Sequence, residues 1–319
     1  MIAALLLVQG SMESEDQGRM TSESLTAMLR MALRARFPDL NVDGLDKVGM
    51  LSAAVKASGW RAAFELGTEV KGLRAHPVVA ALASASYPEL VLDRWLRLER
   101  FGHSRNRTEL LSTQPGERTT IVLHHVALDG GSIHFVSDLF IWGVLVGLME
   151  LAGIEVCSAA IADSPEAVAV SDRDLLHEST AEVRGETSVL QLTCASAAAH
   201  TPQAPALTES RGIALRLSAL LRDDLLRRWD LNTAASALGL SRRSLQRQLS
   251  EAKSTFSETL LRTRVDAAEQ MMRDSRLKLG EIGFCAGFAD QAHFTRSFRR
   301  FYDVPPSAFR DLVLSAETR

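Results

Sequence analysis

The sequence has 319 residues, of which 46% are hydrophobic and 24% are charged. This length suits two domains better than one, and the composition excludes a disordered chain and a fibrous repeat. Residues 213–319 hold 18 lysines and arginines against 13 acidic residues, whereas residues 1–212 hold 18 against 26. The C-terminal part can therefore attract a polyanion such as DNA, and the acidic N-terminal part cannot.

Cysteine usage and hydropathy both favour a cytoplasmic protein. The three cysteines are widely separated and lack the close pairs typical of zinc sites or redox dithiols, so we expect no metal and no cofactor. The apolar residues 1–10 lack a basic leader, and they are far shorter than the ~20 residues that span a bilayer. The apolar run at 139–153 is interrupted by Glu150 and predicts a buried helix. We therefore expect no membrane segment.

Residues 1–20 are treated as an N-terminal extension, and residues 21–195 predict an effector-binding or dimerisation domain of mixed α/β class. Spacings of three and four between apolar residues predict helices at 24–36, 48–57, 60–66, 89–101 and 138–152. Apolar stretches rich in β-branched residues predict strands at 119–128, 154–162 and 188–194. Residues 196–211 hold two prolines and no apolar period, so they predict a linker to a domain at 212–319.

The predicted helix 89–101 carries three arginines beside its apolar face, Arg94, Arg97 and Arg100. We interpret it as an amphipathic surface helix. The alternative is that these arginines bind nucleic acid.

The stretch "LNTAASALGLSRRSLQRQL" (231–249) has the pattern of a helix-turn-helix. Ala235 allows two helices to cross closely, Gly239 permits the positive φ of the turn, and Ser241 can cap the second helix. The second helix exposes four polar side chains near the end that enters the major groove, namely Arg242, Arg243, Gln246 and Arg247. Arg can bind guanine and Gln can bind adenine through paired hydrogen bonds, although an ordinary charged face is the alternative.

A second copy of this pattern lies at 279–304, with Gly283 at the helix crossing and Gly287 at the turn. Its second helix begins near Asp290, and its outward side chains are Gln291, His293 and Arg296, followed by Arg299 and Arg300. A solvated helix end is the alternative for the last two. A helix at 256–272 would span roughly 25 Å between the copies, comparable with the ~34 Å between successive major-groove faces.

The segments "LGLSRRSLQRQL" and "GFADQAHFTRSFRRFYDVPPSAFR" resemble the DNA-binding domain of the AraC/XylS family of bacterial transcription regulators. The resemblance covers about Leu215 to Leu312 and implies an all-α domain with two helix-turn-helix units joined by a helix, bound to double-stranded DNA. By position, the resemblance implies base contacts from Arg243, Gln246 and Arg247 in the first helix-turn-helix unit, here called the first reader, and from Gln291, His293 and Arg296 in the second reader. Arg242, on the exposed face of the first reader, is a further expected base contact. The expected phosphate contacts are Ser241, Ser244, Thr295 and Arg299. Gly283 stands where the family usually has Ala, which should cost roughly 1 kcal/mol of helix propensity.

The stretch "PELVLDRWLRLERF" and the order strand, apolar helix, strand across 119–162 are similar to the arabinose-binding-type sensory domain of one branch of that family. This resemblance implies a regulatory domain that binds a small-molecule effector or forms a homodimer. It also implies RNA polymerase as a partner.

The motif "HHVALDG" (124–130) favours another class, because it resembles the HHxxxDG pattern of condensation domains and related acyltransferases. That resemblance implies His125 as general base and Asp129 as its structural support. A strand end that turns through Asp-Gly-Gly is the plainer interpretation, under which the protein is no enzyme. In a third, His124, His125 or Asp129 lines an effector pocket, with an apolar wall from Trp60, Trp95 or Trp142.

Overall fold

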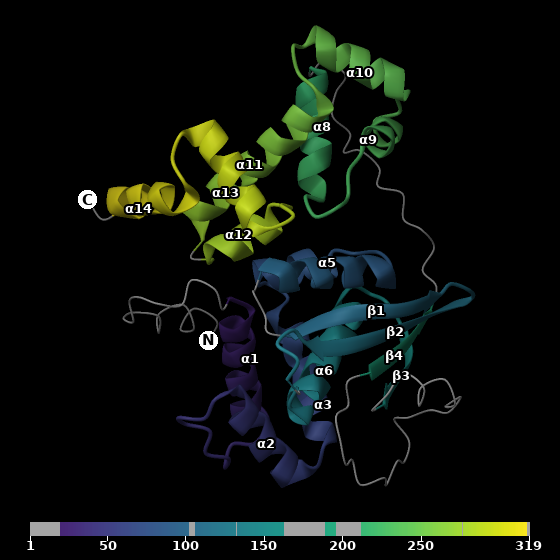
Figure 1. The fold of residues 1–319 in the computed structure, drawn as a ribbon, viewed down its shortest axis with the longest axis vertical. Helices are drawn as coiled ribbons and strands as arrows, with labels where there is room; N and C mark the ends of the chain where they lie inside the picture. Colours follow the sequence, from purple (N-terminus) through teal and green to yellow (C-terminus); the bar gives the residue numbers. More distant parts are fainter. Residues whose placement is uncertain are drawn as a thin grey trace.

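The computed structural model describes residues 20–101, 106–131, 133–162, 189–195, 212–275 and 277–317 (Figure 1). The N-terminal elements are α1 (Met20–Arg36), α2 (Lys47–Ser58), α3 (Arg61–Thr68), the 3₁₀ helix η2 (Glu69–Leu73), α4 (Pro77–Ala83), α5 (Pro88–Phe101), β1 (Asn106–Gln114), β2 (Arg118–Ala127), α6 (Phe135–Leu151), β3 (Val156–Ala162) and β4 (Val189–Ala195). The C-terminal elements are α8 (Ile213–Asp223), α9 (Leu231–Ala237), α10 (Arg242–Glu251), α11 (Phe256–Asp274), α12 (Leu279–Cys285), α13 (Gln291–Tyr302) and α14 (Pro306–Glu317).

The predicted order, a mixed α/β region followed by an all-helical region, is confirmed by these elements. The predicted strands correspond to β2, β3 and β4, and the predicted apolar helix corresponds to α6. Strand β1 and helix α4 were not predicted. The predicted linker and residues 1–19 of the predicted extension lie outside the described residues, so both domain boundaries stay predictions.

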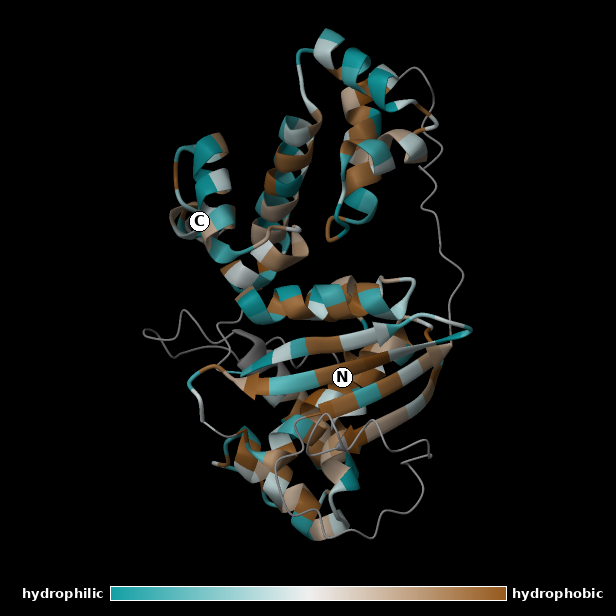
Figure 2. Cartoon of the chain, turned by 45° about the vertical axis from the view of Figure 1, so that its right-hand side comes forward, coloured by the Kyte–Doolittle hydropathy of each residue, from teal (hydrophilic) through white to brown (hydrophobic). Residues whose placement is uncertain are grey.

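The sheet has the strand order β1-β2-β4-β3, and every neighbouring pair is antiparallel. Alternation along β2 buries Ile121, Leu123 and His125, while the residues between them are half-buried. Helix α5 lies along the β1 edge of the sheet in both views of the chain (Figures 1 and 2). There Trp95 of α5 donates through Nε1 to Thr108 Oγ1 of β1, at 3.1 Å.

Helices α3 and α6 cross with their backbones in contact. A Cβ atom built on Gly143 of α6 would lie 1.9 Å from the carbonyl oxygen of Phe64 and 3.1 Å from the Cα atom of Gly67. Helix α6 is apolar around its whole circumference and is buried from Val136 to Met149, which is why it fills the core. Among the described helices, none combines the length and the apolar character needed to cross a membrane.

The α3–α6 crossing predicts that Gly143→Ala is strongly destabilising, because the added methyl group meets backbone atoms that cannot rotate away. We expect the free energy of unfolding to fall by about 1–3 kcal/mol or more, the usual cost of overpacking a core. Thermal and urea unfolding of the full chain measure this. Gly72→Ala is the control, since its Cβ would have no heavy atom within 4 Å. Equal stability of the two variants would contradict the crossing.

The first helix-turn-helix unit, α8 to α10, has a hydrophobic core of its own. This core includes Leu217, Leu221, Trp229, Leu245 and Leu249, all buried. Helix α11 then leads to the second unit, formed by α12 and α13.

The second unit instead shares one core with the N-terminal region. Phe284, Phe294 and Phe298 belong to the same buried cluster as Leu98 and Phe101 of α5. The rings of Phe101 and Phe284 meet edge to face, with centroids 6.3 Å apart. A Cβ atom on Gly283 would lie 3.0 Å from both Phe101 and Phe294. A glycine at this position therefore leaves room for an aromatic ring of the N-terminal region.

The prediction that α5 is a surface helix is wrong. Only Arg100 of its three arginines is exposed, whereas Arg94 and Arg97 are 0% and 6% exposed. Both lie between the sheet region and the helix-turn-helix units, where they bind C-terminal residues. The periodicity of a single helix marks its polar face, but it does not tell whether another domain covers that face.

Candidate nucleic-acid interface

The first reader is built by local capping and one left-handed turn. Asp230 begins α9, because its carboxylate accepts hydrogen bonds from the backbone N–H groups of Asn232 (2.7 Å) and Thr233 (2.8 Å). Gly239 then takes a φ of +69°, and Ser241 caps α10 by accepting from the N–H of Ser244 at 3.1 Å. The roles predicted for Gly239 and Ser241 are confirmed.

Helix α10 buries Leu245 and Leu249 and presents its polar face to solvent. The exposed side chains on that face are Arg242, Arg243, Gln246 and Arg247. Arg247 pairs with Glu251 one turn later, with 2.8 Å between Nη1 and Oε1. Such an exposed ion pair stabilises the folded protein by less than about 1 kcal/mol. It therefore does not prevent Arg247 from binding another acceptor. Figure 2 shows α10 as a largely hydrophilic helix at one end of the molecule.

The second reader follows the same plan. Gly287 takes a φ of +82°, and Asp290 caps α13 by accepting from the N–H of His293 at 2.7 Å. Phe294 and Phe298 fix the inner face of α13 in the core.

On its outer face α13 is less accessible than α10. Arg296 and Arg299 are exposed, whereas Gln291, His293 and Thr295 are half-buried. The ring of His293 packs edge to face on Phe288, with centroids 5.4 Å apart. Burial lowers the pKa of His293; Asp290 opposes this shift, and Arg264 and Arg296 add to it. His293 is therefore a neutral imidazole at neutral pH, suited to a directional hydrogen bond rather than to holding a charge.

Comparison with known proteins identifies the type of domain that contains these two readers. A family model described as a helix-turn-helix domain matches residues 234–311. The C-terminal region carries an AraC-type helix-turn-helix domain. The match begins at residue 234, so the predicted arabinose-binding-type domain stays a prediction.

Relatives of the AraC-type domain are transcription regulators by name. The "HTH-type transcriptional activator FapR" of Escherichia coli is 28% identical over 94 residues, which are 30% of this chain and 36% of FapR. The "Ornithine utilization regulator" of Pseudomonas aeruginosa is 38% identical over 82 residues, 26% of this chain and 24% of that protein. The chain thus spans about a quarter to a third of the length of these relatives. A solved AraC-type regulator from Chromobacterium violaceum is 22% identical, with a TM-score of 0.30 over 31% of this chain and 89% of its own.

The predicted phosphate contacts of the AraC-type domain lie at the start and on the outer side of its two second helices. Ser241 and Ser244 bind each other through their hydroxyls at 2.9 Å, beside the first turn of α10. Helix N-termini and hydroxyls of this kind suit phosphate oxygens. Thr295 and Arg299 lie on α13, half-buried and exposed respectively.

The four residues predicted to line an effector pocket are not brought together. His124 and His125 are neighbours on β2 and point to opposite faces of the sheet, as strand alternation requires. Asp129 is exposed in the following turn, where it accepts from the N–H of Gly131 at 3.0 Å. Trp95 is buried in α5 and donates to Glu99 at 2.9 Å.

The motif "HHVALDG" has a structural role in this fold. The Nδ1 atom of His125 lies 2.7 Å from Asp138 Oδ1 of α6, and its ring meets Trp142 edge to face. His125 is 5% exposed, and Asp129 does not support it. Burial raises the pKa of Asp138, while the hydrogen bond from His125 opposes that shift. The geometry gives no support to a general base at His125, which needs access to a substrate.

A small apolar cavity lies where the N-terminal region meets the AraC-type domain. It has a volume of about 40 Å³ and is lined by residues of α4, α5 and α6 that include Val79, Trp95, Leu98 and Val144. Glu281 of α12 lies at the same cavity. Such a volume is only about three times the roughly 10–15 Å³ that a single water needs. The cavity is too small for a metabolite.

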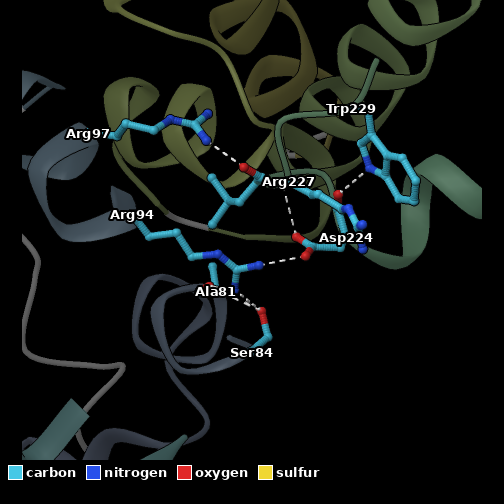
Figure 3. Close-up of polar contacts among 8 residues, drawn as sticks. Ala81, Ser84, Arg94, Arg97, Asp224, Arg227 and Trp229 are labelled. Carbon is cyan, nitrogen blue, oxygen red and sulfur yellow. Dashed lines mark hydrogen bonds and ion pairs between the residues drawn. The ribbon is translucent and has the colours of Figure 1, made fainter. Parts of the chain in front are cut away.

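Sequence reasoning missed the residues that join the two regions, which Figure 3 shows. Arg94 of α5 donates to Asp224 at 2.6 Å, and Arg97 donates to the carbonyl oxygen of Leu226. The available signal was their spacing, because Arg94 and Arg97 lie one turn apart on the same side of α5 as Leu98 and Phe101.

The two turn glycines of the readers give a matched pair of variants. A Cβ atom on Gly239 would meet nothing within 4 Å, whereas one on Gly287 would lie 2.0 Å from the carbonyl oxygen of Leu225. Gly239→Ala should therefore cost only the left-handed conformation, about 1–2 kcal/mol. Gly287→Ala should cost that amount plus about 1–3 kcal/mol for the clash. Urea unfolding of both variants measures the difference, and an equal loss of stability would show that Leu225 does not lie against the second turn.

Proposed function

We propose that this protein is a sequence-specific transcription regulator whose AraC-type domain reads two successive major grooves of double-stranded DNA. The observation that carries this proposal is the pair of capped second helices, α10 and α13, in two units that the 19-residue helix α11 connects. Each helix exposes arginine beside other hydrogen-bonding side chains, the residue types that read base edges. Such a regulator works in the compartment that holds the DNA.

Base reading is assigned to the outer faces of both helices. On α10 the proposed base contacts are Arg242, Arg243, Gln246 and Arg247, and on α13 they are Gln291, His293 and Arg296. Phosphate binding is assigned to Ser241, Ser244, Thr295 and Arg299. All four α10 residues are exposed, which supports a larger share of the base reading for the first reader.

Control is assigned to the N-terminal region, through a small-molecule signal or through dimerisation, with RNA polymerase as the partner at the promoter. The names of the relatives support a role in regulation, since one is called an activator and another a regulator of ornithine utilisation. The contacts of α5 with both readers support a regulatory role for this region, because they connect it directly to the DNA-binding part.

The proposed function predicts different losses for base and phosphate contacts. Selection from a random DNA library with the full chain gives the preferred sequence, and binding is then measured on that sequence and on random DNA at one salt concentration. Gln246→Ala and Arg247→Ala should each cost about 1–3 kcal/mol on the selected sequence only.

Arg299→Ala is the phosphate control, which should weaken both DNAs to a similar extent. Equal losses on both DNAs for Gln246→Ala and Arg247→Ala would contradict base reading by α10. Retention of DNA without any selected sequence would contradict the proposed function as a whole.

A further inference from the structure

Two consecutive residues attach α5 to the segment that leads into the first reader. Asp93 pairs with Arg228, and the fully buried Arg94 donates to Asp224 at 2.6 Å. Asp224 in turn accepts from the N–H of Arg227 at 3.1 Å, so the α8–α9 loop is held in a defined conformation (Figure 3). These bonds connect α5 to the first reader alone.

Arg97 connects α5 to both readers at once. Its guanidinium donates through Nη1 to the carbonyl oxygen of Leu226 in the α8–α9 loop, which precedes α9. Through Nη2 it donates to the carbonyl oxygens of Gly287 (3.1 Å) and Phe288 (3.3 Å), in the turn of the second reader. Arg97 is 6% exposed, so these bonds form in a dry environment, where hydrogen bonds are strong and unpaired carbonyls are costly.

The two loops that Arg97 binds lie against each other. A Cβ atom on Gly287 would lie 2.0 Å from the carbonyl oxygen of Leu225, so the second turn packs directly on the α8–α9 loop. The side chain of Leu226 is 3% exposed and belongs to the core shared by the N-terminal region and the second unit, not to the core of the first unit. The contact between the α8–α9 loop and the turn of the second reader therefore lies against α5.

The opposite side of α5 is held by the sheet. Glu99 accepts hydrogen bonds from the backbone N–H (2.9 Å) and the hydroxyl (2.8 Å) of Thr108 in β1, and also from Trp95. A displacement of α5 relative to the sheet would break the buried bonds between Glu99 and Thr108. The sheet therefore fixes the position of α5, and with it the position of Arg97.

We propose that Arg97 is a positioning residue that fixes the second reader relative to the first, and so sets the spacing between the two DNA elements that the readers recognise. This inference rests on the proposed function. A single planar guanidinium bridges the α8–α9 loop and the α12–α13 turn, a geometry that the single ammonium of lysine does not reproduce. Burial, and to a smaller extent repulsion by the nearby Arg97, lowers the pKa of Arg264 in α11 to about 10. Because Arg264 repels Arg97, the position of the Arg97 guanidinium depends on its carbonyl acceptors.

The test compares full-length variants on DNA duplexes that carry the two selected elements at the preferred spacing, or with one, two or five base pairs inserted. Five base pairs are about half a helical turn and move the second element to the opposite side of the duplex. Wild type should lose about tenfold or more in affinity when the second reader is misplaced. In Arg97→Met the ratio of affinities at preferred and altered spacings should fall towards one, while the base preference within each element is kept.

Arg97→Lys keeps the buried charge and should show the same loss of spacing preference if Arg97→Met fails to fold. Arg100→Met, on the exposed side of α5, is the matched control and should behave as wild type. An unchanged spacing ratio in both Arg97 variants would overturn the inference, even if affinity fell at every spacing, because that result indicates a merely structural role. A rise in affinity at every spacing would also overturn it and indicate an inhibitory contact. A wild-type chain that selects no sequence would contradict the proposed function instead.

Discussion

The burial of the polar face of α5 is the constraint on which the arrangement of this molecule depends. Burying a guanidinium is costly unless its donors find acceptors, and Arg97 finds acceptors on two loops that lie 61 residues apart in the sequence, at Leu226 and Gly287. The two terminal nitrogens of Arg94 donate to Asp224, Ala81 and Ser84, whereas its Nε has no partner among the described residues. Removing the C-terminal region would take these acceptors from Arg97, and removing the N-terminal region would take both donors from Asp224, Leu226 and Gly287, so the two regions stabilise each other.

The two readers differ in how they depend on the rest of the chain. The first has a hydrophobic core of its own, and the polar face of its α10 is exposed. The second has its aromatic residues in the core of the N-terminal region and keeps Gln291 and His293 half-buried. The packing of the second reader therefore depends on the N-terminal region more than the packing of the first reader does.

Local patterns predicted the readers well, because caps and turns are determined within a few residues. Gly239, Ser241 and Asp290 take the roles that their spacing indicates. The burial of Arg94 and Arg97 was not predictable, since it depends on loops more than 120 residues away. The alternation of a strand predicts that His124 and His125 point to opposite faces of the sheet. The match to the motif "HHVALDG" nevertheless led to both being assigned to one predicted pocket. His125 pairs instead with Asp138, a residue outside the motif.

Hydrogen exchange of the full chain under increasing denaturant, followed residue by residue, tests the shared core most directly. Amides of elements that open together exchange with one free energy, and separate units give separate values. The amides of α12 and α13 should open together with those of α5 and α6, while α9 and α10 open at a lower free energy of their own. Exchange of α12 and α13 together with α9 and α10, at a value distinct from that of α6, would contradict the account.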